Sequence, residues 1–179
     1  MGRTEAQDTG TTVLDGMPDG DLRVLLLGCC DAPSWADAML ARRPFGTAAR
    51  LLAAAEDELR STSEADVDTA LAAHPRIGAK PTGADSRREQ SAALAGDPAV
   101  LASLATGNRE YEARFGHVYL VCASGRSAEE LLAVLRSRLG NDPGTERRVL
   151  RGELVAITLL RLQRALDSAD KGAAPDGGV

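Results

Sequence analysis

Aromatic side chains are scarce in this chain of 179 residues, where Phe, Trp and Tyr together make up 3%. Apolar residues still reach 44%, which is usual for a globular protein, so the core has to be built mainly from Leu, Ala and Val. Ala and Leu lose little side-chain entropy in a helix. The composition therefore favours helices, and the length fits one domain with a core of its own.

Cysteine and histidine are also few, with three cysteines and two histidines in the chain. Cys29 and Cys30 are adjacent and Cys122 stands alone, and this odd number argues against a disulfide framework. Reduced thiols in a cytosolic protein are the simpler interpretation. Zinc-ligand spacing is absent and two histidines cannot supply a His-rich site, so the sequence predicts no metal.

The chain lacks both a basic surplus and a long apolar run. Its formal net charge is −5, which argues against nucleic-acid binding because that requires a basic face. A pocket can still be locally positive on an acidic protein, so a small anionic substrate remains open. The run Val24–Leu27 is too short to span a bilayer, and residues 1–20 lack the apolar segment of a signal peptide. We therefore expect a cytoplasmic protein that binds neither nucleic acid nor membranes.

Helical patterns recur along the chain, whereas strand patterns are nearly absent. Apolar side chains at helical spacing predict amphipathic helices, for example over residues 48–59 and, at the greatest length, over about 143–166. The run Val118–Cys122 has strand composition but no partner run, so we expect a buried extended segment. These patterns predict an all-α fold, a single compact domain of about seven to nine helices at residues 21–167, between flexible tails at 1–20 and 168–179.

The first candidate site residue is His74, which begins the motif H-P-R-I-G at residues 74–78. Histidine titrates near neutrality, so it can donate or accept a proton at working pH. Pro75 prevents the helix from continuing and thereby fixes the direction of the histidine. On spacing alone, a histidine that only satisfies free carbonyls at a helix end is the more ordinary interpretation.

The second candidate is the segment Ser86–Gln90, with the sequence S-R-R-E-Q. S-x-x-E is the capping-box pattern, in which Ser86 caps a helix and Glu89 reaches back to its amide. In the alternative interpretation, the helix N-terminus at Ser86 offers N–H groups to an anion, and Glu89 faces a reacting centre. The spacing by itself favours the cap.

Two further candidates are the segment Phe115–Gly125 and Arg161. The small residues Ala123, Ser124 and Gly125 would let a ligand approach the main chain, although a buried connector is the plainer interpretation. Arg161 lies in an apolar stretch, and an outward position is common for a helical arginine. If Arg161 points inward, it needs an anionic partner, which a bound carboxylate would supply.

Taken in order along the chain, these motifs resemble those of one family. They are C-C-x4-W at 29–35, R-P-F at 43–45, H-P-R-I-G at 74–78, S-x-x-E-Q at 86–90, N-x-x-Y at 108–111, R-F-G-H-V-Y-L-V-C-A at 114–123 and R-L-G-N-D at 138–142. The family is that of 2-oxo-4-hydroxy-4-carboxy-5-ureidoimidazoline (OHCU) decarboxylases. The resemblance covers about residues 21–164, and its most specific part is the pair of motifs at 74–78 and 86–90.

The resemblance implies an all-helical, cofactor-independent carboxy-lyase that converts the ureidoimidazoline to (S)-allantoin and CO2 in urate degradation. It implies that His74 donates a proton, that Glu89 works beside it, and that Arg161 matches an arginine near the end of the family's last helix. A homodimer is suggested by the resemblance alone. The resemblance also implies substrate contacts from Pro75, Ser86, Arg87, Arg88, Gln90, Val121, Cys122, Ala123, Ser124 and Gly125.

Loss of CO2 leaves an electron pair on a ring carbon beside a carbonyl, and an enolate can hold that pair without a cofactor. Two other classes of function stay open, namely a helical ligand-binding module without catalysis and a scaffold whose pocket is filled by side chains. A nearer alternative is a decarboxylase of another ureido or hydantoin acid. A cavity shared by His74, Glu89 and Arg161 would exclude the scaffold.

Overall fold

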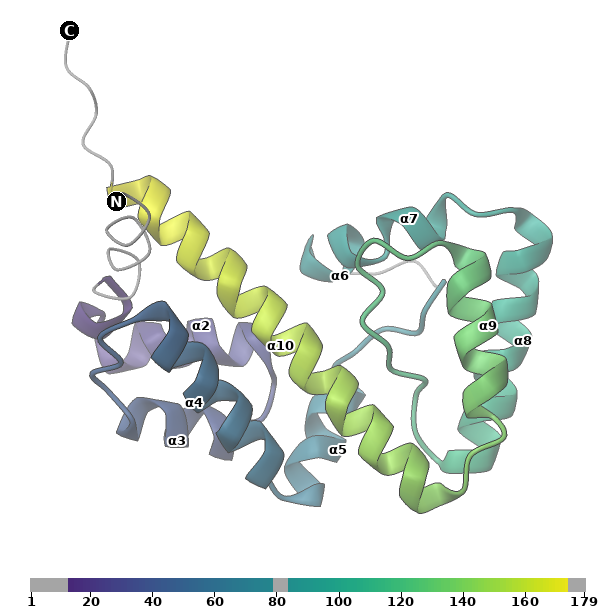
Figure 1. The fold of residues 1–179 in the computed structure, drawn as a ribbon, viewed down its shortest axis with the longest axis horizontal. Helices are drawn as coiled ribbons and strands as arrows, with labels where there is room; N and C mark the ends of the chain where they lie inside the picture. Colours follow the sequence, from purple (N-terminus) through teal and green to yellow (C-terminus); the bar gives the residue numbers. More distant parts are fainter. Residues whose placement is uncertain (1–12, 79–83, 174–179) are drawn as a thin grey trace, which may run out of the picture. The chain divides into compact units, whose positions relative to one another are not determined.

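The chain is helical in the computed structural model, which describes residues 13–78 and 84–173 (Figure 1). No strand occurs in these two ranges, so the prediction of an all-α fold is confirmed. Helical residues 13–16 precede nine further helices, which makes the number of helices in this part slightly higher than predicted. The helices are α2 (Asp19–Cys29), α3 (Pro33–Ala41), α4 (Ala48–Ser61), α5 (Glu64–Ala72), α6 (Ala84–Glu89), α7 (Ser91–Leu94), α8 (Pro98–Phe115), α9 (Ala128–Arg138) and α10 (Pro143–Ala173).

Contacts group the chain into two compact units. Unit 1 runs to Asp66 and resumes at Thr158, and unit 2 is Val67–Ile157. The divisions fall inside α5 and inside α10.

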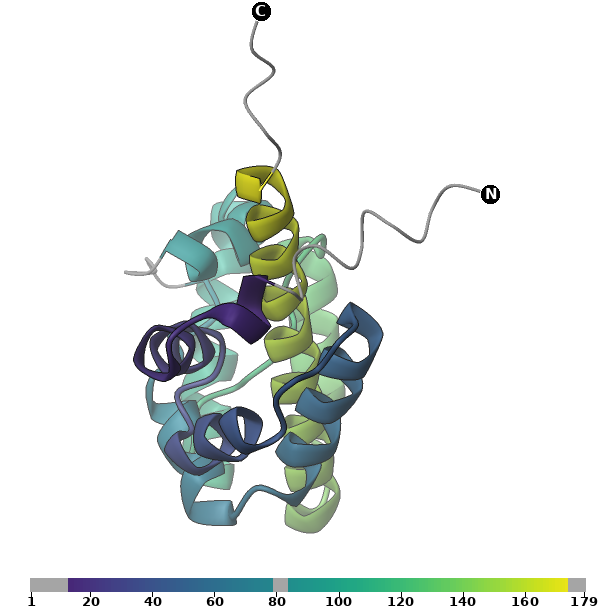
Figure 2. The same ribbon diagram turned by 90° about the vertical axis from the view of Figure 1, so that its left-hand side faces the viewer.

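Unit 1 is built around α3, which packs against α2 and α4 (Figure 2). The indole of Trp35 is 1% exposed and donates Nε1–H to the carbonyl oxygen of Ala55 at 3.2 Å. The predicted amphipathic helix at 48–59 is present as α4, with Leu51 and Leu59 buried, and the Thr47 hydroxyl caps it.

The folded part of the chain begins earlier and ends later than the sequence predicted. Leu14 is 1% exposed, and the carboxylate of Asp15 accepts the N–H groups of Phe45 at 2.8 Å and Gly46 at 2.9 Å. The predicted N-terminal tail therefore contains structured residues, which the sequence hid because Val13 and Leu14 are the only adjacent apolar residues among residues 1–20. At the other end α10 continues to Ala173, past the predicted boundary at 167. The remaining parts of both predicted tails, residues 1–12 and 174–179, lie outside the described residues.

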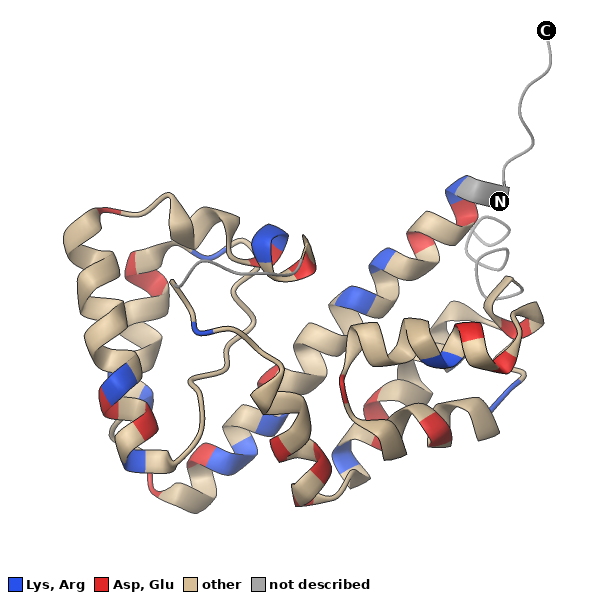
Figure 3. Ribbon diagram, turned by 180° about the vertical axis from the view of Figure 1, so that it is seen from behind, with Lys and Arg blue, Asp and Glu red and all other residues tan. Residues whose placement is uncertain are grey.

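Unit 2 has its core between α8 and α9. Asp97 caps α8 by accepting the N–H of Ala99 at 2.7 Å, and the helix ends at Gly116 in a left-handed conformation. Ser127 and Glu130 form a capping box at the start of α9. Charged residues of both signs lie in the C-terminal part of α8 and along α10 (Figure 3).

The segment that connects α8 to α9 runs as an extended, uncoiled trace (Figure 1) but pairs with no strand in the described part of the chain. Tyr119, Leu120, Val121 and Ala123 are each at most 3% exposed. The prediction of a buried extended segment is therefore confirmed, and this segment forms one wall of the pocket in unit 2.

Candidate active site

A small pocket in unit 2 contains both His74 and Glu89. Its volume, about 20 Å³, accommodates little more than one water molecule. The residues that line it are His74, Pro75, Ile77, Ser86, Glu89, Gln90, Leu120, Val121, Ala123 and Ile157. The structure thus brings together seven of the predicted site residues, and it adds Ile77, Leu120 and Ile157.

His74 follows the end of α5, and its ring is oriented by that helix. Nδ1 lies 2.7 Å from the carbonyl oxygen of Ala70. A carbonyl oxygen can only accept, so Nδ1 carries a proton and donates it. Nε2, which is buried from solvent, is therefore the nitrogen that can exchange a proton. His74 therefore fits both interpretations drawn from the sequence. One ring nitrogen satisfies a carbonyl at the helix end, and the ring also lines the pocket, where it can exchange a proton.

The loop that follows His74 is held against α8 by two side chains of that helix. Asn108 is 3% exposed and donates Nδ2–H to the carbonyl oxygen of Ile77 at 2.8 Å. The guanidinium of Arg76 contacts both carboxylate oxygens of Glu112, at 2.5 and 2.7 Å. This hydrogen bonding holds the pKa of Glu112 below its usual value. These contacts fix the loop against α8.

The capping-box interpretation of Ser86 is wrong, because α6 begins at Ala84 and Ser86 is its third residue. The N–H of Ser86 still belongs to the first turn of α6, where N–H groups have no partner within the helix, so an anion contact there stays a prediction. Glu89 is instead the last residue of α6, with only 7% of its surface exposed, and its side chain lines the pocket. The sequence could not locate this start because residues 78–83, directly before Ala84, include two glycines and a proline and carry no helical pattern. Residues 79–83 lie outside the described ranges.

The predicted substrate contacts at 86–90 separate into two groups. Ser86 and Gln90 line the pocket, and Gln90 also accepts the N–H of Gly78 at 3.0 Å through Oε1. The φ of Gly78 is +79°, a left-handed conformation that glycine adopts more readily than other residues. Arg87 and Arg88 are exposed and do not line the pocket.

The extended segment contributes a shorter wall than predicted. Val121 and Ala123 line the pocket, whereas Cys122, Ser124 and Gly125 do not. Cys122 is half-buried, and burial raises the pKa of its thiol. Ser124 and Gly125 are exposed in the turn that precedes α9.

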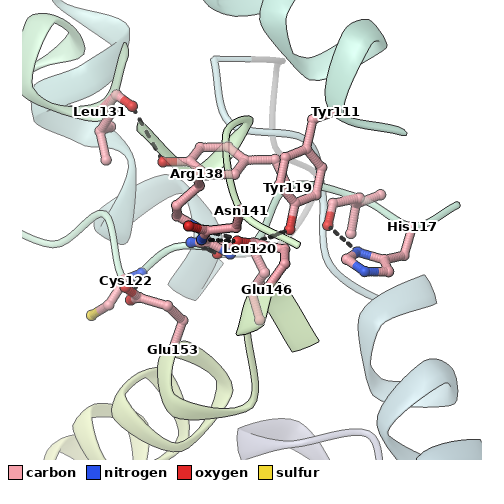
Figure 4. Close-up of polar contacts among 11 residues, drawn as sticks. Tyr111, His117, Tyr119, Leu120, Cys122, Leu131, Arg138, Asn141, Glu146 and Glu153 are labelled. Atoms are coloured by element: carbon pink, nitrogen blue, oxygen red, sulfur yellow. Dashed lines mark hydrogen bonds and ion pairs between the residues drawn. The ribbon is translucent and has the colours of Figure 1, made fainter. Parts of the chain in front are cut away.

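A buried polar network lies behind this wall (Figure 4). Arg138 is 5% exposed and Glu146 is 0% exposed. Nε and Nη2 of Arg138 lie 2.8 and 2.5 Å from Oε1 of Glu146, while Nη1 donates to the carbonyl oxygen of Leu120 at 2.7 Å. The Tyr111 hydroxyl donates to the same carboxylate oxygen, and Asn141 donates to Oε2 at 2.7 Å. The wall is therefore anchored to two helices through one ion pair.

Aromatic rings cover this ion pair. The guanidinium carbon of Arg138 lies 4.9 Å from the ring centroid of Tyr119 and 5.7 Å from that of Tyr111. Burial raises the pKa of both phenols. Reasoning from single residues did not find this network, because Arg138 at a helix end and Glu146 near a helix start look like ordinary surface charges. Three of the motifs, at 108–111, 114–123 and 138–142, contain members of this network.

Arg161, the third predicted catalytic residue, belongs to unit 1. Its side chain is half-buried, and Nη1 donates to the carbonyl oxygen of Cys29 at 3.3 Å. The adjacent Cys30 is 1% exposed, and burial raises the pKa of its thiol to about 11. The role of Arg161 at the site stays a prediction.

Within residues 13–78 and 84–173, no group of three or more His, Cys, Asp or Glu side chains could hold a metal ion. None of the three cysteines, which all fall in these ranges, forms a disulfide. No helix in the described ranges is both long and apolar enough to cross a membrane.

Comparisons with known proteins give the same family that the motifs suggested. The family model for OHCU decarboxylase matches residues 15–163. The chain is 33% identical over 141 residues to "2-oxo-4-hydroxy-4-carboxy-5-ureidoimidazoline decarboxylase" of Amia calva, which covers 73% of this chain and 79% of the relative. It is 31% identical over 151 residues to "Uric acid degradation bifunctional protein TTL" of Arabidopsis thaliana, covering 80% of this chain. The chain spans only 47% of that bifunctional relative.

Solved structures agree with this result. A crystal structure of an OHCU decarboxylase in the presence of (S)-allantoin matches 84% of this chain and 99% of its own, with a TM-score of 0.73 and 30% identity. A crystal structure of an (S)-allantoin synthase covers 87% of this chain and 53% of its own, with a TM-score of 0.68. Because this second pair is 19% identical, it supports the fold alone.

Proposed function

The chain belongs to the OHCU decarboxylase family, and from that premise we propose that it converts 2-oxo-4-hydroxy-4-carboxy-5-ureidoimidazoline to (S)-allantoin and CO2 in urate degradation. The observation that carries the proposal is the pairing of His74 and Glu89 in one buried pocket, inside the range that the family model matches. The relative crystallised in the presence of (S)-allantoin supports the identity of the product.

The reaction breaks the bond between a ring carbon and its carboxylate, and CO2 leaves. The electron pair stays on the ring carbon and spreads into the neighbouring carbonyl as an enolate, so the substrate supplies its own electron sink. The protein has to hold the carboxylate roughly perpendicular to the conjugated system, stabilise the enolate oxygen, and deliver a proton to one face.

His74 is suited to deliver that proton. As an imidazolium it keeps Nδ1–H on the carbonyl of Ala70 and offers Nε2–H to the ring carbon. After the transfer, the neutral ring is already in the tautomer that Ala70 selects, so no rearrangement is needed. Because the ring direction is fixed by α5, protonation occurs on one face and yields one enantiomer.

The neighbouring residues orient the substrate in this proposal. The carboxylate of Glu89 accepts a hydrogen bond from the substrate hydroxyl or a ring nitrogen, and the small side chain of Ala123 in the wall lets the ring approach the main chain. Arg161 is proposed to bind an anionic group of the substrate. The substrate is much larger than one water molecule, so lining side chains have to move when it binds.

The direct test generates the short-lived substrate in place with urate oxidase and hydroxyisourate hydrolase. Adding the protein should speed the appearance of optically active allantoin, followed by circular dichroism, and should speed CO2 release. Unchanged rates with a folded protein would refute the decarboxylase, and binding without turnover would favour the ligand-binding module. Faster CO2 release only from another ureido or hydantoin acid would favour the nearer alternative.

The oligomeric state and the cellular location of the protein are also proposals. We infer a homodimer and a cytoplasmic location from the family resemblance and the cysteine content. Analytical ultracentrifugation of the full chain tests the first, and fractionation of the source cells tests the second.

A further inference from the structure

Two charged side chains hold the pocket wall from behind, at successive points of the extended segment. Arg138 donates Nη1–H to the carbonyl oxygen of Leu120 at 2.7 Å, and Oε2 of Glu153 accepts the N–H of Cys122 at 2.8 Å (Figure 4). In an extended chain, the C=O of one residue and the N–H of the second residue along point to the same edge. Both contacts are therefore made on one edge of the segment.

The main-chain groups of Val121 then point to the opposite edge. Val121 is 2% exposed and lines the pocket, yet its N–H and C=O make no hydrogen bond to any described part of the chain. A buried peptide group without a hydrogen bond is costly, and a ligand in the pocket would remove that cost. The wall is thus arranged to present one donor and one acceptor to a bound molecule.

The two anchors differ in their surroundings. Arg138 is enclosed by Glu146 and two tyrosine rings, so a substitution there disturbs a whole buried network. Glu153 stands on α10 and is half-buried. Glu153 is therefore the anchor that can be changed with the least damage to the core.

We propose that Glu153 and Arg138 are positioning residues for the decarboxylation, because they fix Leu120–Cys122 so that the peptide groups of Val121 meet the substrate. The inference rests on the proposed function. Neither side chain lines the pocket in unit 2, so each acts through the wall rather than on the substrate.

The test compares variants of Glu153 in the full chain by steady-state kinetics and by the enantiomeric purity of the allantoin formed. Glu153→Ala should lower kcat/KM by about 10-fold or more, the usual effect of losing a charged hydrogen bond that holds a site in place. It should also lower the enantiomeric purity when enough variant is added to match the wild-type rate, a condition under which loss of active protein alone would leave the purity unchanged. Glu153→Gln should recover most of the rate, because its amide oxygen can accept the same N–H.

Glu129→Ala is the matched control, since it removes an exposed carboxylate from the first turn of α9 and should leave both readouts unchanged. If Glu153→Ala does not fold, as judged by far-UV circular dichroism, Glu153→Asp withdraws the carboxylate by one methylene and should give an intermediate loss. Wild-type kinetics and purity in the folded Ala or Asp variant would overturn the inference. So would a Gln variant as impaired as the Ala variant. An inactive wild-type protein would instead overturn the proposed function.

Discussion

The imidazole of His74 is directed by the main chain of the helix that precedes it. The contact from Nδ1 to the Ala70 oxygen sets the tautomer, and the buried position of Nε2 keeps bulk water from competing for the proton. Glu89 reaches the same pocket from the end of α6. At the scale of single residues, the proposed chemistry thus depends on two side chains that each stand at the C-terminal end of a helix.

His74→Asn tests the role of the imidazole without removing its structural contact. The Asn amide can still donate to Ala70, so we expect a folded protein, but it cannot titrate near neutrality. The kcat should fall about 10²–10⁴-fold, as is usual when a general acid is lost. His117→Asn, which changes the other histidine and lies outside the pocket, is the control and should keep its activity. A His74→Asn variant with wild-type turnover in the allantoin assay would contradict the assignment.

At the scale of elements, the contact between α8 and α9 carries the wall of the pocket. Gly107 allows the two helices to approach, because a Cβ at this position would lie 2.6 Å from Cδ2 of Leu135. Leu135 is 0% exposed, so it cannot swing away from an added methyl group. The close approach also keeps Arg138, at the end of α9, within reach of Leu120.

Gly107→Ala should therefore lower the free energy of unfolding by about 1–3 kcal/mol, the usual cost of overpacking a core. The matched control is Gly152→Ala in α10, where a Cβ would meet nothing within 4 Å. That change should raise the free energy of unfolding by about 0.5–1 kcal/mol, because Ala is the better helix former. Urea unfolding measures the free energy of unfolding of both variants. Equal effects of the two substitutions would show that the α8–α9 contact is not tight.

The sequence predicted the long helices α4 and α10 well, but it placed the start of the short helix α6 wrongly. Periodic apolar residues located α4 and α10, because each helix buries one continuous stripe. The start of α6 was missed because S-x-x-E matches a capping box wherever it stands, and six residues are too few for a periodic signal. The motifs at 74–78 and 86–90 still located the pocket, since chemistry depends on residue identity more than on helix boundaries.

At the scale of the whole molecule, the two units divide the proposed site residues between them. His74 and Glu89 belong to unit 2, and Arg161 belongs to unit 1. Sequence order alone could not assign residues to units, because each boundary falls within a helix that the periodicity shows as continuous. The polar network around Glu146 was hidden for a related reason, since its partners come from distant parts of the sequence.

Global stability should fall as the pH rises from about 9 to about 11. Burial raises the pKa of Cys30 from 9.0 to about 11 and also raises the pKa of Tyr111 and Tyr119, so the unfolded chain releases these protons first. A folded state that binds more protons loses stability with rising pH. For Cys30 the loss is at most about 3 kcal/mol. Urea unfolding of the wild type and Cys30→Ala at pH 8 and pH 10.5, under reducing conditions, measures it. Parallel pH dependences in the two proteins would contradict the prediction.

The contact between His74 and Ala70 spans four residues, about one helical turn. The proposed proton donor is consequently tied to the last turn of α5, where helices fray most easily. Warming should release the ring from its direction while the rest of the molecule stays folded. Catalytic rate and optical purity should then decline together at temperatures below the cooperative melting transition.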